Sequence, residues 1–158
     1  MSDGMGGILA GLKVLELTQA PSGAFCAKLL ADQGADAIKL EAPGWGDQMR
    51  NEPPFIGGEP HPDRSTTFLA LNTNKRGITL DLEQAAGRSL LLRLAAITDV
   101  IVESFAPGYL DHLGVGYDAL RVVNPGVILV SITYFGQTGP YANYKGDDLI
   151  AQAMGASV

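Results

Sequence analysis

Short apolar runs alternate along the chain with longer segments in which apolar residues recur every three or four positions. The runs Lys13–Leu17, Ala37–Glu41, Gly77–Leu80, Val100–Glu103 and Val127–Thr133 predict strands. They are short and rich in Val, Ile and Leu, which is typical of strands that are buried on both faces of a sheet. The pattern between them is helical, so the sequence predicts strands and helices in alternation.

The segment Gly23–Gln33 predicts the first helix, with Ser22 as its N-cap and Gly34 just beyond its C-terminal end. A second helix is predicted from Asp81 to about Ile97, opened by the capping pattern D-x-x-Q. Its apolar residues lie on most sides, so we expect it to be buried. Shorter helices are predicted at Pro107–Leu113, Tyr117–Val123 and Leu149–Met154, the last capped by Asp147 or Asp148.

Alternating strands and helices predict an α/β fold with a mostly parallel, Rossmann-like sheet that has helices on both faces. We expect a single domain over residues 1–158. Pro43–Ser65 is rich in Gly, Pro and charge and has no periodicity, so it is predicted to be a long excursion. In such sheets ligands bind at the carboxyl ends of the strands. Here those ends are Thr18–Ser22, Glu41–Asp47, Glu103–Gly108 and Thr133–Gly139.

Composition narrows the classes of function. Eleven basic and 17 acidic residues give a net charge of −6, which disfavours a nucleic-acid binder but leaves room for an anionic ligand at a local positive site. Cys26 is the single cysteine, so no internal disulfide is expected and a reducing cytoplasm is predicted. His61 and His112 do not have the spacing of a metal site. No apolar run reaches the ~18 residues that span a bilayer, so no membrane partner is expected.

A series of sequence blocks resembles the family III CoA-transferases, the group that includes carnitine and formyl-CoA transferases and the 2-methylacyl-CoA racemases. Leu9–Thr18 is similar to the family opening L-x-G-x-x-V-L-D-x-T, and Pro43–Arg50 is similar to P-x-x-G-D-x-x-R. The resemblance extends from Leu9 to Gly155. The other blocks follow in family order and are Asp32–Glu41, Asn74–Arg76, Leu80–Leu82, Val102–Gly108, Leu113–Leu120, Asn124–Pro125 and Gly136–Tyr141.

The resemblance implies transfer of coenzyme A from an acyl-CoA to a small carboxylic acid. In the family, an aspartate attacks the thioester and covalent intermediates follow. The resemblance places that aspartate beyond Val158, so no catalytic nucleophile is expected among these residues. CoA is then a substrate, and no tightly bound cofactor is expected. The chain resembles the N-terminal portion of a larger interlocked dimer, which implies a homodimer or pairing with a complementary chain.

Coenzyme A carries a 3′-phosphate, a pyrophosphate and an adenine, which need cations or free backbone N–H groups and an apolar slot. Arg50, Lys75 and Arg76 lie beside predicted strands and could supply charge, and Leu80 and Leu82 could form the slot. Ordinary packing at strand ends explains the two leucines equally well. The resemblance adds further CoA contacts at Ser104, Phe105, Pro107, Gly108, His112 and Lys145, with Ser104 standing where the family usually has Asn.

The turn after the first strand resembles the wall of the family's acyl site, so Gln19, Ala20 and Pro21 are predicted to contact substrate. Free N–H groups of such a turn can stabilise an oxyanion. Gly136 and Gln137 lie in a loop that resembles an active-site loop of the family. Asp148 matches an acidic position close to the active site and is a possible auxiliary, although helix capping explains an Asp there equally well.

Two other functions remain open. The first is a racemase-type acyl-CoA enzyme. In this chain Asp147 stands at the position that the resemblance matches to the racemase's acid/base His, which disfavours racemisation. The second is a non-catalytic module that binds CoA or assembles with another chain. The module predicts CoA binding without turnover, whereas the racemase predicts exchange of the α-proton without transfer.

Overall fold

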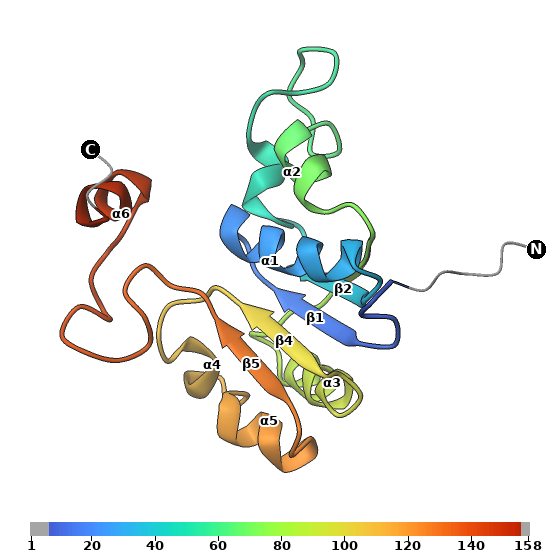
Figure 1. Cartoon of the computed structure of the whole chain (residues 1–158), viewed down its shortest axis with the longest axis vertical. Helices are drawn as coiled ribbons and strands as arrows, with labels where there is room; N and C mark the ends of the chain where they lie inside the picture. Colours follow the sequence, from blue (N-terminus) through green and yellow to red (C-terminus); the bar gives the residue numbers. More distant parts are fainter. Residues whose placement is uncertain (1–6, 156–158) are drawn as a thin grey trace, which may run out of the picture.

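The computed structural model describes residues 7–155 and contains a five-stranded sheet in which all pairings are parallel. The strand order is β3-β2-β1-β4-β5 (Figure 1). The strands are β1 (Lys13–Leu17), β2 (Asp36–Glu41), β3 (Lys75–Thr79), β4 (Val100–Glu103) and β5 (Ile128–Ser131). The predicted α/β fold with a parallel sheet is confirmed.

The chain progresses from β1 outward in one direction through β2 and β3, and then returns to the other side of β1 for β4 and β5. The direction of winding therefore reverses between β1 and β4. In open parallel sheets the crevice at such a reversal, outside the carboxyl ends of the strands, is where ligands bind. The topology alone thus points to the residues that follow β1 and β4.

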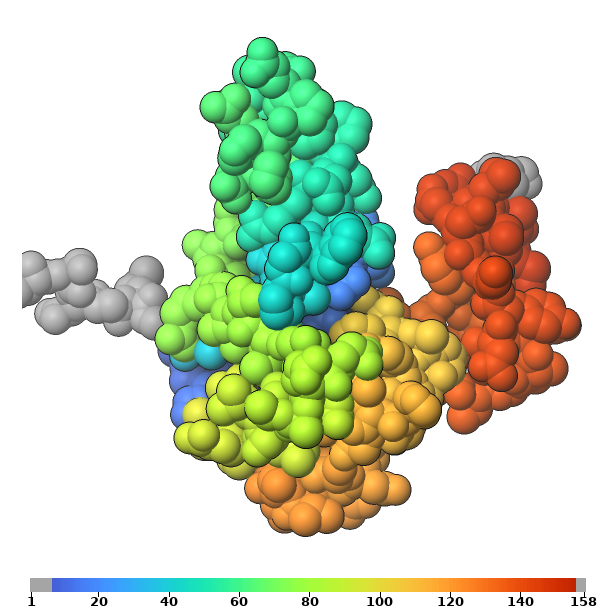
Figure 2. Space-filling model, turned by 180° about the vertical axis from the view of Figure 1, so that it is seen from behind, coloured from blue at the N-terminus to red at the C-terminus, as the bar shows by residue number. Residues whose placement is uncertain are grey.

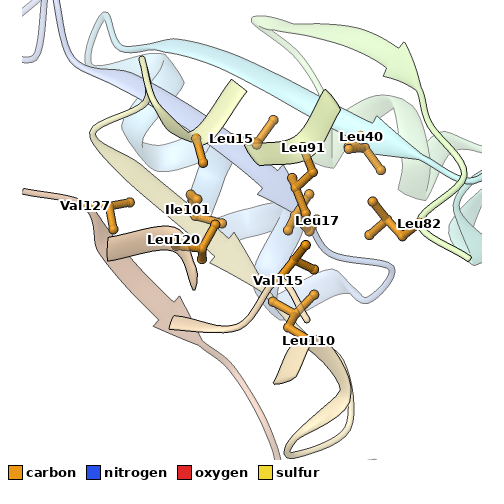
Figure 3. Close-up of a cluster of buried hydrophobic side chains, with 11 residues drawn as sticks. Leu15, Leu17, Leu40, Leu82, Leu91, Ile101, Leu110, Val115, Leu120 and Val127 are labelled. Carbon is orange, nitrogen blue, oxygen red and sulfur yellow. The ribbon is translucent and has the colours of Figure 1, made fainter. Parts of the chain in front are cut away.

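Helices cover both faces of the sheet. The helices of the described residues are α1 (Pro21–Asp32), α2 (Thr66–Leu71), α3 (Ala85–Ala95), α4 (Tyr109–His112), α5 (Tyr117–Val123) and α6 (Asp148–Met154), with a short 3-10 helix η1 (Gln48–Asn51). The larger buried cluster joins β1 and β4 to α3, α4 and α5 through Leu15, Leu17, Ile101, Leu91 and Leu120 (Figure 3). On the opposite face, Val14 and Val102 pack with Ala31 of α1.

Helix α1 begins at Pro21, with Ala20 in the N-cap position, so the prediction of Ser22 as the N-cap is wrong. The physical reason is Pro21, because a proline has the φ of a helix and no N–H to satisfy, which suits the first helical position. The predicted end is confirmed, since Gln33 is the C-cap and Gly34 follows with a φ of 99°. A left-handed residue after the C-cap is what favours glycine there.

Helix α3 differs from its prediction. It spans Ala85–Ala95 rather than Asp81 to about Ile97, because the Asp81 carboxylate accepts a hydrogen bond from the Glu83 N–H and forms a turn before the helix. It is also not buried on all sides. Leu91 and Ala95 are fully buried, whereas Leu90 is 43% exposed. Its apolar surface is a single face that lies on the sheet.

The bounds of several shorter elements also differ from their predictions. Strand β3 begins at Lys75, two residues before the predicted Gly77, and the predicted helix Pro107–Leu113 is reduced to α4 with Gly108 as its N-cap. Helix α2 was not predicted, and Ser65 caps it by accepting a hydrogen bond from the Phe68 N–H. Helix α5 has the predicted bounds, and Asp147 caps α6 as predicted by accepting from the Ile150 N–H.

The segment after β5 leaves the sheet and ends in α6, which stands apart from the main body in both views (Figures 1 and 2). Helix α6 has no buried residue, and Leu149 and Met154 are 69% and 65% exposed. A ligand site is therefore expected between this segment and the sheet.

Candidate functional site

A cavity of about 850 Å³ lies where β1 and β4 end. Three parts of the chain form its walls: the start of α1, the loop after β4, and the segment from the end of β5 to α6. Its lining is mostly apolar, which suits a site for an organic ligand. Its position at the reversal point of the sheet agrees with the expectation from topology. Its lining residues include Ala20, Pro21, Ser104, Phe105, Phe135 and Lys145.

The turn after β1 and the loop after β4 are joined directly. The Gln19 N–H donates to the Ser104 Oγ atom across 3.3 Å, so Ser104 makes a contact that depends on its hydroxyl group. Within residues 7–155, the N–H groups of Ser22 and Gly23 have no protein acceptor, because they belong to the first turn of α1. Ser22 lines the cavity beside Pro21, and free N–H groups at the start of a helix suit a negatively charged group.

Aromatic side chains form the wall on the C-terminal side. The rings of Phe135, Tyr141 and Tyr144 cluster with centroid distances of 5.2 to 6.4 Å, and Phe135 and Tyr144 line the cavity. Lys145 is exposed and adds a positive charge to the same wall. An apolar wall with one cation suits an organic ligand that carries a negative group.

Behind the turn lies a cluster of buried charges, which we call the Glu16 cluster: Glu16, Lys39, Asp47 and Lys75. Lys39 Nζ is 2.7 Å from Glu16 Oε1 and 2.6 Å from Asp47 Oδ2, and Lys75 Nζ is 2.7 Å from Glu16 Oε2. Each of the four side chains is at most 2% exposed. Two carboxylates face two ammonium groups, so the cluster is electrically balanced.

Arg50 makes a separate ion pair at the end of β2. Its Nε and Nη2 atoms each donate to a Glu41 carboxylate oxygen across 2.7 Å, and its guanidinium lies 3.7 Å from the centre of the Phe68 ring. Burial acts to raise the pKa of Glu41, but the hydrogen bonds from Arg50 and the Asp47 N–H outweigh it and hold this pKa below its usual value. Arg50 therefore anchors the Pro43–Ser65 segment to the sheet.

The predicted site residues fall into two groups. Ala20, Pro21, Ser104, Phe105, Pro107, Lys145 and Asp148 all line the large cavity. The others lie elsewhere, and their contact with CoA stays a prediction. Lys75 Nζ is enclosed by Glu16, the Ala24 carbonyl and Asn72, and burial lowers its pKa. Arg50 is paired with Glu41, as described above.

Of the remaining candidates, Arg76 is exposed and makes a two-point pair with Asp36. Leu82 is buried in the core, and Leu80 packs against the same cluster. His112 lies exposed at the end of α4. Gly108 and Gln137 line a smaller cavity of about 260 Å³, and neither Gln19 nor Gly136 lines the large one, although Gln19 is bonded to Ser104.

Sequence reasoning missed two features of the site. The aromatic wall was signalled by the density of Tyr and Phe between residues 134 and 144. The Glu16 cluster was signalled by charged residues at the centres of two apolar strands, KVLEL and DAIKLE. A charge in such a position has to be paired when it is buried, and this requirement predicts a partner from another strand.

The family model described as "CoA-transferase family III" matches residues 9–158. This chain belongs to CoA-transferase family III. Among curated relatives, the succinyl-CoA:glutarate CoA-transferase of Mus musculus is 42% identical over 92% of this chain and 33% of its own length. The formyl-CoA:oxalate CoA-transferase of Streptomyces avermitilis is 42% identical over 95% of this chain and 35% of its own. The chain thus spans about a third of these relatives.

Solved structures with the same fold are also similar in sequence to this chain. A CAIB/BAIF family protein from Brucella suis superposes with a TM-score of 0.87 at 44% identity, covering 96% of this chain and 40% of that one. A protein from Mycobacterium tuberculosis superposes with a TM-score of 0.84 at 37% identity. Over residues 7–155, no group of three or more His, Cys, Asp or Glu is arranged to hold a metal ion. No helix in that part of the chain is long and apolar enough to cross a membrane.

Proposed function

We propose that the protein to which this chain contributes transfers coenzyme A from an acyl-CoA to a carboxylic acid. The observation that supports this most strongly is the large cavity at the reversal point of the sheet. Its walls are built from blocks that the chain shares with family III CoA-transferases, and it brings together an apolar surface, unpaired N–H groups and Lys145. Membership of the family and the names of the relatives support the reaction.

The reaction divides into steps that exchange one acyl bond for another. A carboxylate of the protein attacks the thioester carbonyl and expels CoA thiolate, which leaves a mixed anhydride. The thiolate attacks the carbonyl that derives from the protein, which releases the donor acid and leaves a protein thioester. The acceptor carboxylate then attacks this thioester and expels CoA thiolate, which leaves a second mixed anhydride. The thiolate finally attacks the acceptor's acyl carbon, which gives the new acyl-CoA and frees the protein carboxylate. The nucleophile in this scheme is an aspartate beyond Val158.

The residues described here would bind and orient the acyl-CoA. The Ser22 and Gly23 N–H groups are candidates to stabilise the oxyanion that forms at each attacked carbonyl. Lys145 suits a phosphate of CoA, and Phe105 with the aromatic wall suits the pantetheine arm. Asp148 lies on the cavity wall at the start of α6, where it could act as an auxiliary group.

The acids involved are proposed to be small dicarboxylic acids. Glutarate, succinate, citramalate and oxalate appear in the names of the curated relatives at 39 to 43% identity.

We also propose that the full-length protein is a homodimer that works in the cytoplasm. The exposed apolar surface of α6 and the lone cysteine support these two points.

The test uses the full-length protein that contains this chain, with succinyl-CoA as donor and glutarate, oxalate and acetate as acceptors. We expect new acyl-CoA to form with the dicarboxylic acids and a CoA adduct to appear in the intact-protein mass. Exchange of the α-proton in deuterated water without transfer would instead support the racemase. Binding of CoA with neither reaction would support the non-catalytic module.

A further inference from the structure

The Glu16 cluster does not line the large cavity, yet its hydrogen bonds end on the backbone at either end of the segment that forms one of the cavity's walls. Lys39 Nζ donates to the Thr18 carbonyl oxygen across 3.0 Å, and Lys75 Nζ donates to the Ala24 carbonyl oxygen across 2.8 Å. Thr18 and Ala24 flank the segment Gln19–Gly23, which joins β1 to α1. Two buried cations thus hold the backbone on either side of this turn.

Thr18 connects the turn to the same carboxylate. Its hydroxyl donates to Glu16 Oε1 across 2.7 Å, and its side chain is completely buried. The start of α1 lies directly against Thr18, since a Cβ atom added to Gly23 would be 2.3 Å from the Thr18 methyl group. The turn therefore rests on the Glu16 cluster through both its backbone and a side chain.

Stability alone is a poor explanation for such a cluster. Removing four charges from water costs free energy that their mutual attraction repays only in part, and apolar residues of similar volume often give equal stability. An arrangement of paired charges does, however, fix geometry, because each ammonium group has several acceptors at defined distances. Groups that contact a reacting carbonyl need this precision, since a displacement of about 1 Å can cost about 100-fold in rate.

We propose that Glu16, Lys39, Lys75 and Thr18 are positioning residues that hold the Gln19–Gly23 turn in place for the acyl group of the substrate. This inference rests on the proposed function, because it gives the turn a task only if an acyl-CoA reacts beside it. None of the four residues lines the large cavity. They act through the Thr18 and Ala24 carbonyl groups and through the packing of Thr18 on Gly23.

The expected signature is a loss of turnover with little change in binding. Most of the CoA molecule, including its nucleotide, is remote from the thioester, so displacement of the turn should not alter the bulk of the contacts with CoA. In the full-length protein, Lys39→Met should lower kcat by about 10- to 100-fold and change KM for acyl-CoA by less than about threefold. Lys28→Met is the matched control, because Lys28 lies on the surface of α1 and pairs with Asp32; it should behave as the wild type.

Lys39→Met leaves Glu16 and Asp47 short of a partner and could reduce the folded fraction. A second pair of variants therefore keeps all four charges. Thr18→Val removes the hydroxyl group that donates a hydrogen bond to Glu16 and should lower kcat by about 10-fold, whereas Thr18→Ser keeps the hydroxyl and should restore most of the activity. The fraction of protein that is folded and binds CoA is measured for each variant by titration.

Four outcomes separate the inference from the function it rests on. A wild type that transfers CoA, with kcat lowered in Thr18→Val and restored in Thr18→Ser at constant KM, supports the inference. A wild-type kcat per folded molecule in both Thr18→Val and Lys39→Met overturns it. A KM that rises in step with the loss of kcat also overturns it, since the cluster would then act on binding. A wild type that neither binds nor transfers CoA overturns the proposed function instead.

Discussion

Single charged residues have two distinct tasks in this molecule. Those of the Glu16 cluster are enclosed by the sheet and α1, whereas Arg50 and Glu41 form a partly exposed pair that ties the excursion after β2 to the end of that strand. The Arg50 guanidinium also stacks on Phe68 of α2. The pair therefore joins β2, η1 and α2, and its loss should be felt as a loss of stability.

The ion pair between Glu41 and Arg50 should make the stability of the protein depend on pH. Glu41→Gln should lower the free energy of unfolding by about 2 kcal/mol at pH 7, because a charged two-point hydrogen bond is lost. The pKa of Glu41 is lower in the folded protein than in the unfolded chain, so the stabilisation is complete above the usual carboxyl pKa. It disappears as the pH falls through the folded-state pKa. Urea unfolding of wild type and variant across this range should therefore show the two curves converging in acid.

The control for this prediction is Arg93→Met on the exposed side of α3. Arg93 makes no ion pair within residues 7–155, so its replacement should leave the stability nearly unchanged at every pH. A difference between wild type and Glu41→Gln that stays constant from neutral to acid pH would show that packing, and not the charge of Glu41, accounts for the effect.

Individual elements were predictable to the extent that their own residues determine them. Helix α5 was predicted with its observed bounds, since it follows a turn and has a clear helical pattern. Helix α2 was missed because it has only six residues, and tertiary contacts such as the burial of Phe68 hold it in place. Strand β3 lies at the edge of the sheet and begins with Lys75, whose buried side chain is paired with Glu16 of another strand.

The site was predictable to a similar degree. Ala20, Pro21 and Phe105 lie on the cavity wall because they follow strands, and the position after a strand can be identified from sequence. The partners of Lys75 and Arg50 could not be identified in this way. Each is paired with a residue from a distant part of the chain, and such pairs depend on the order of strands in the sheet.

At the scale of elements, the contact between α3 and the preceding loop gives a second prediction. A Cβ atom on Gly87 would lie 1.7 Å from the Asp81 carbonyl oxygen, which is backbone and cannot rotate away. Gly87→Ala gains about 1 kcal/mol of helical propensity, but overpacking of this severity costs more. We expect the free energy of unfolding of Gly87→Ala to be about 2 kcal/mol lower than that of the wild type, as measured by thermal or urea unfolding. Ser89→Ala, at an exposed position of the same helix, should change the stability by less than about 0.5 kcal/mol.

The whole molecule consists of a packed sheet domain and a C-terminal segment that contacts little of it (Figure 2). The sheet domain contains the continuous cores on both faces of the sheet. The C-terminal segment carries exposed Tyr134, Tyr144, Leu149 and Met154. A soluble monomer seldom leaves so much apolar surface together, and such a surface usually contacts another part of the protein or another molecule.

We therefore predict that these 158 residues, produced alone, associate with a second copy through the α6 surface. Leu149→Ser combined with Met154→Ser should shift the protein toward the monomer in sedimentation velocity, because the apolar area that drives association is removed. Val122→Ser is the matched control, since Val122 is 82% exposed on α5, far from α6 in Figure 1. Association that persists unchanged in the double variant would contradict the role of α6 and point instead to the open edges of the sheet at β3 and β5, where unpaired backbone groups can add another strand.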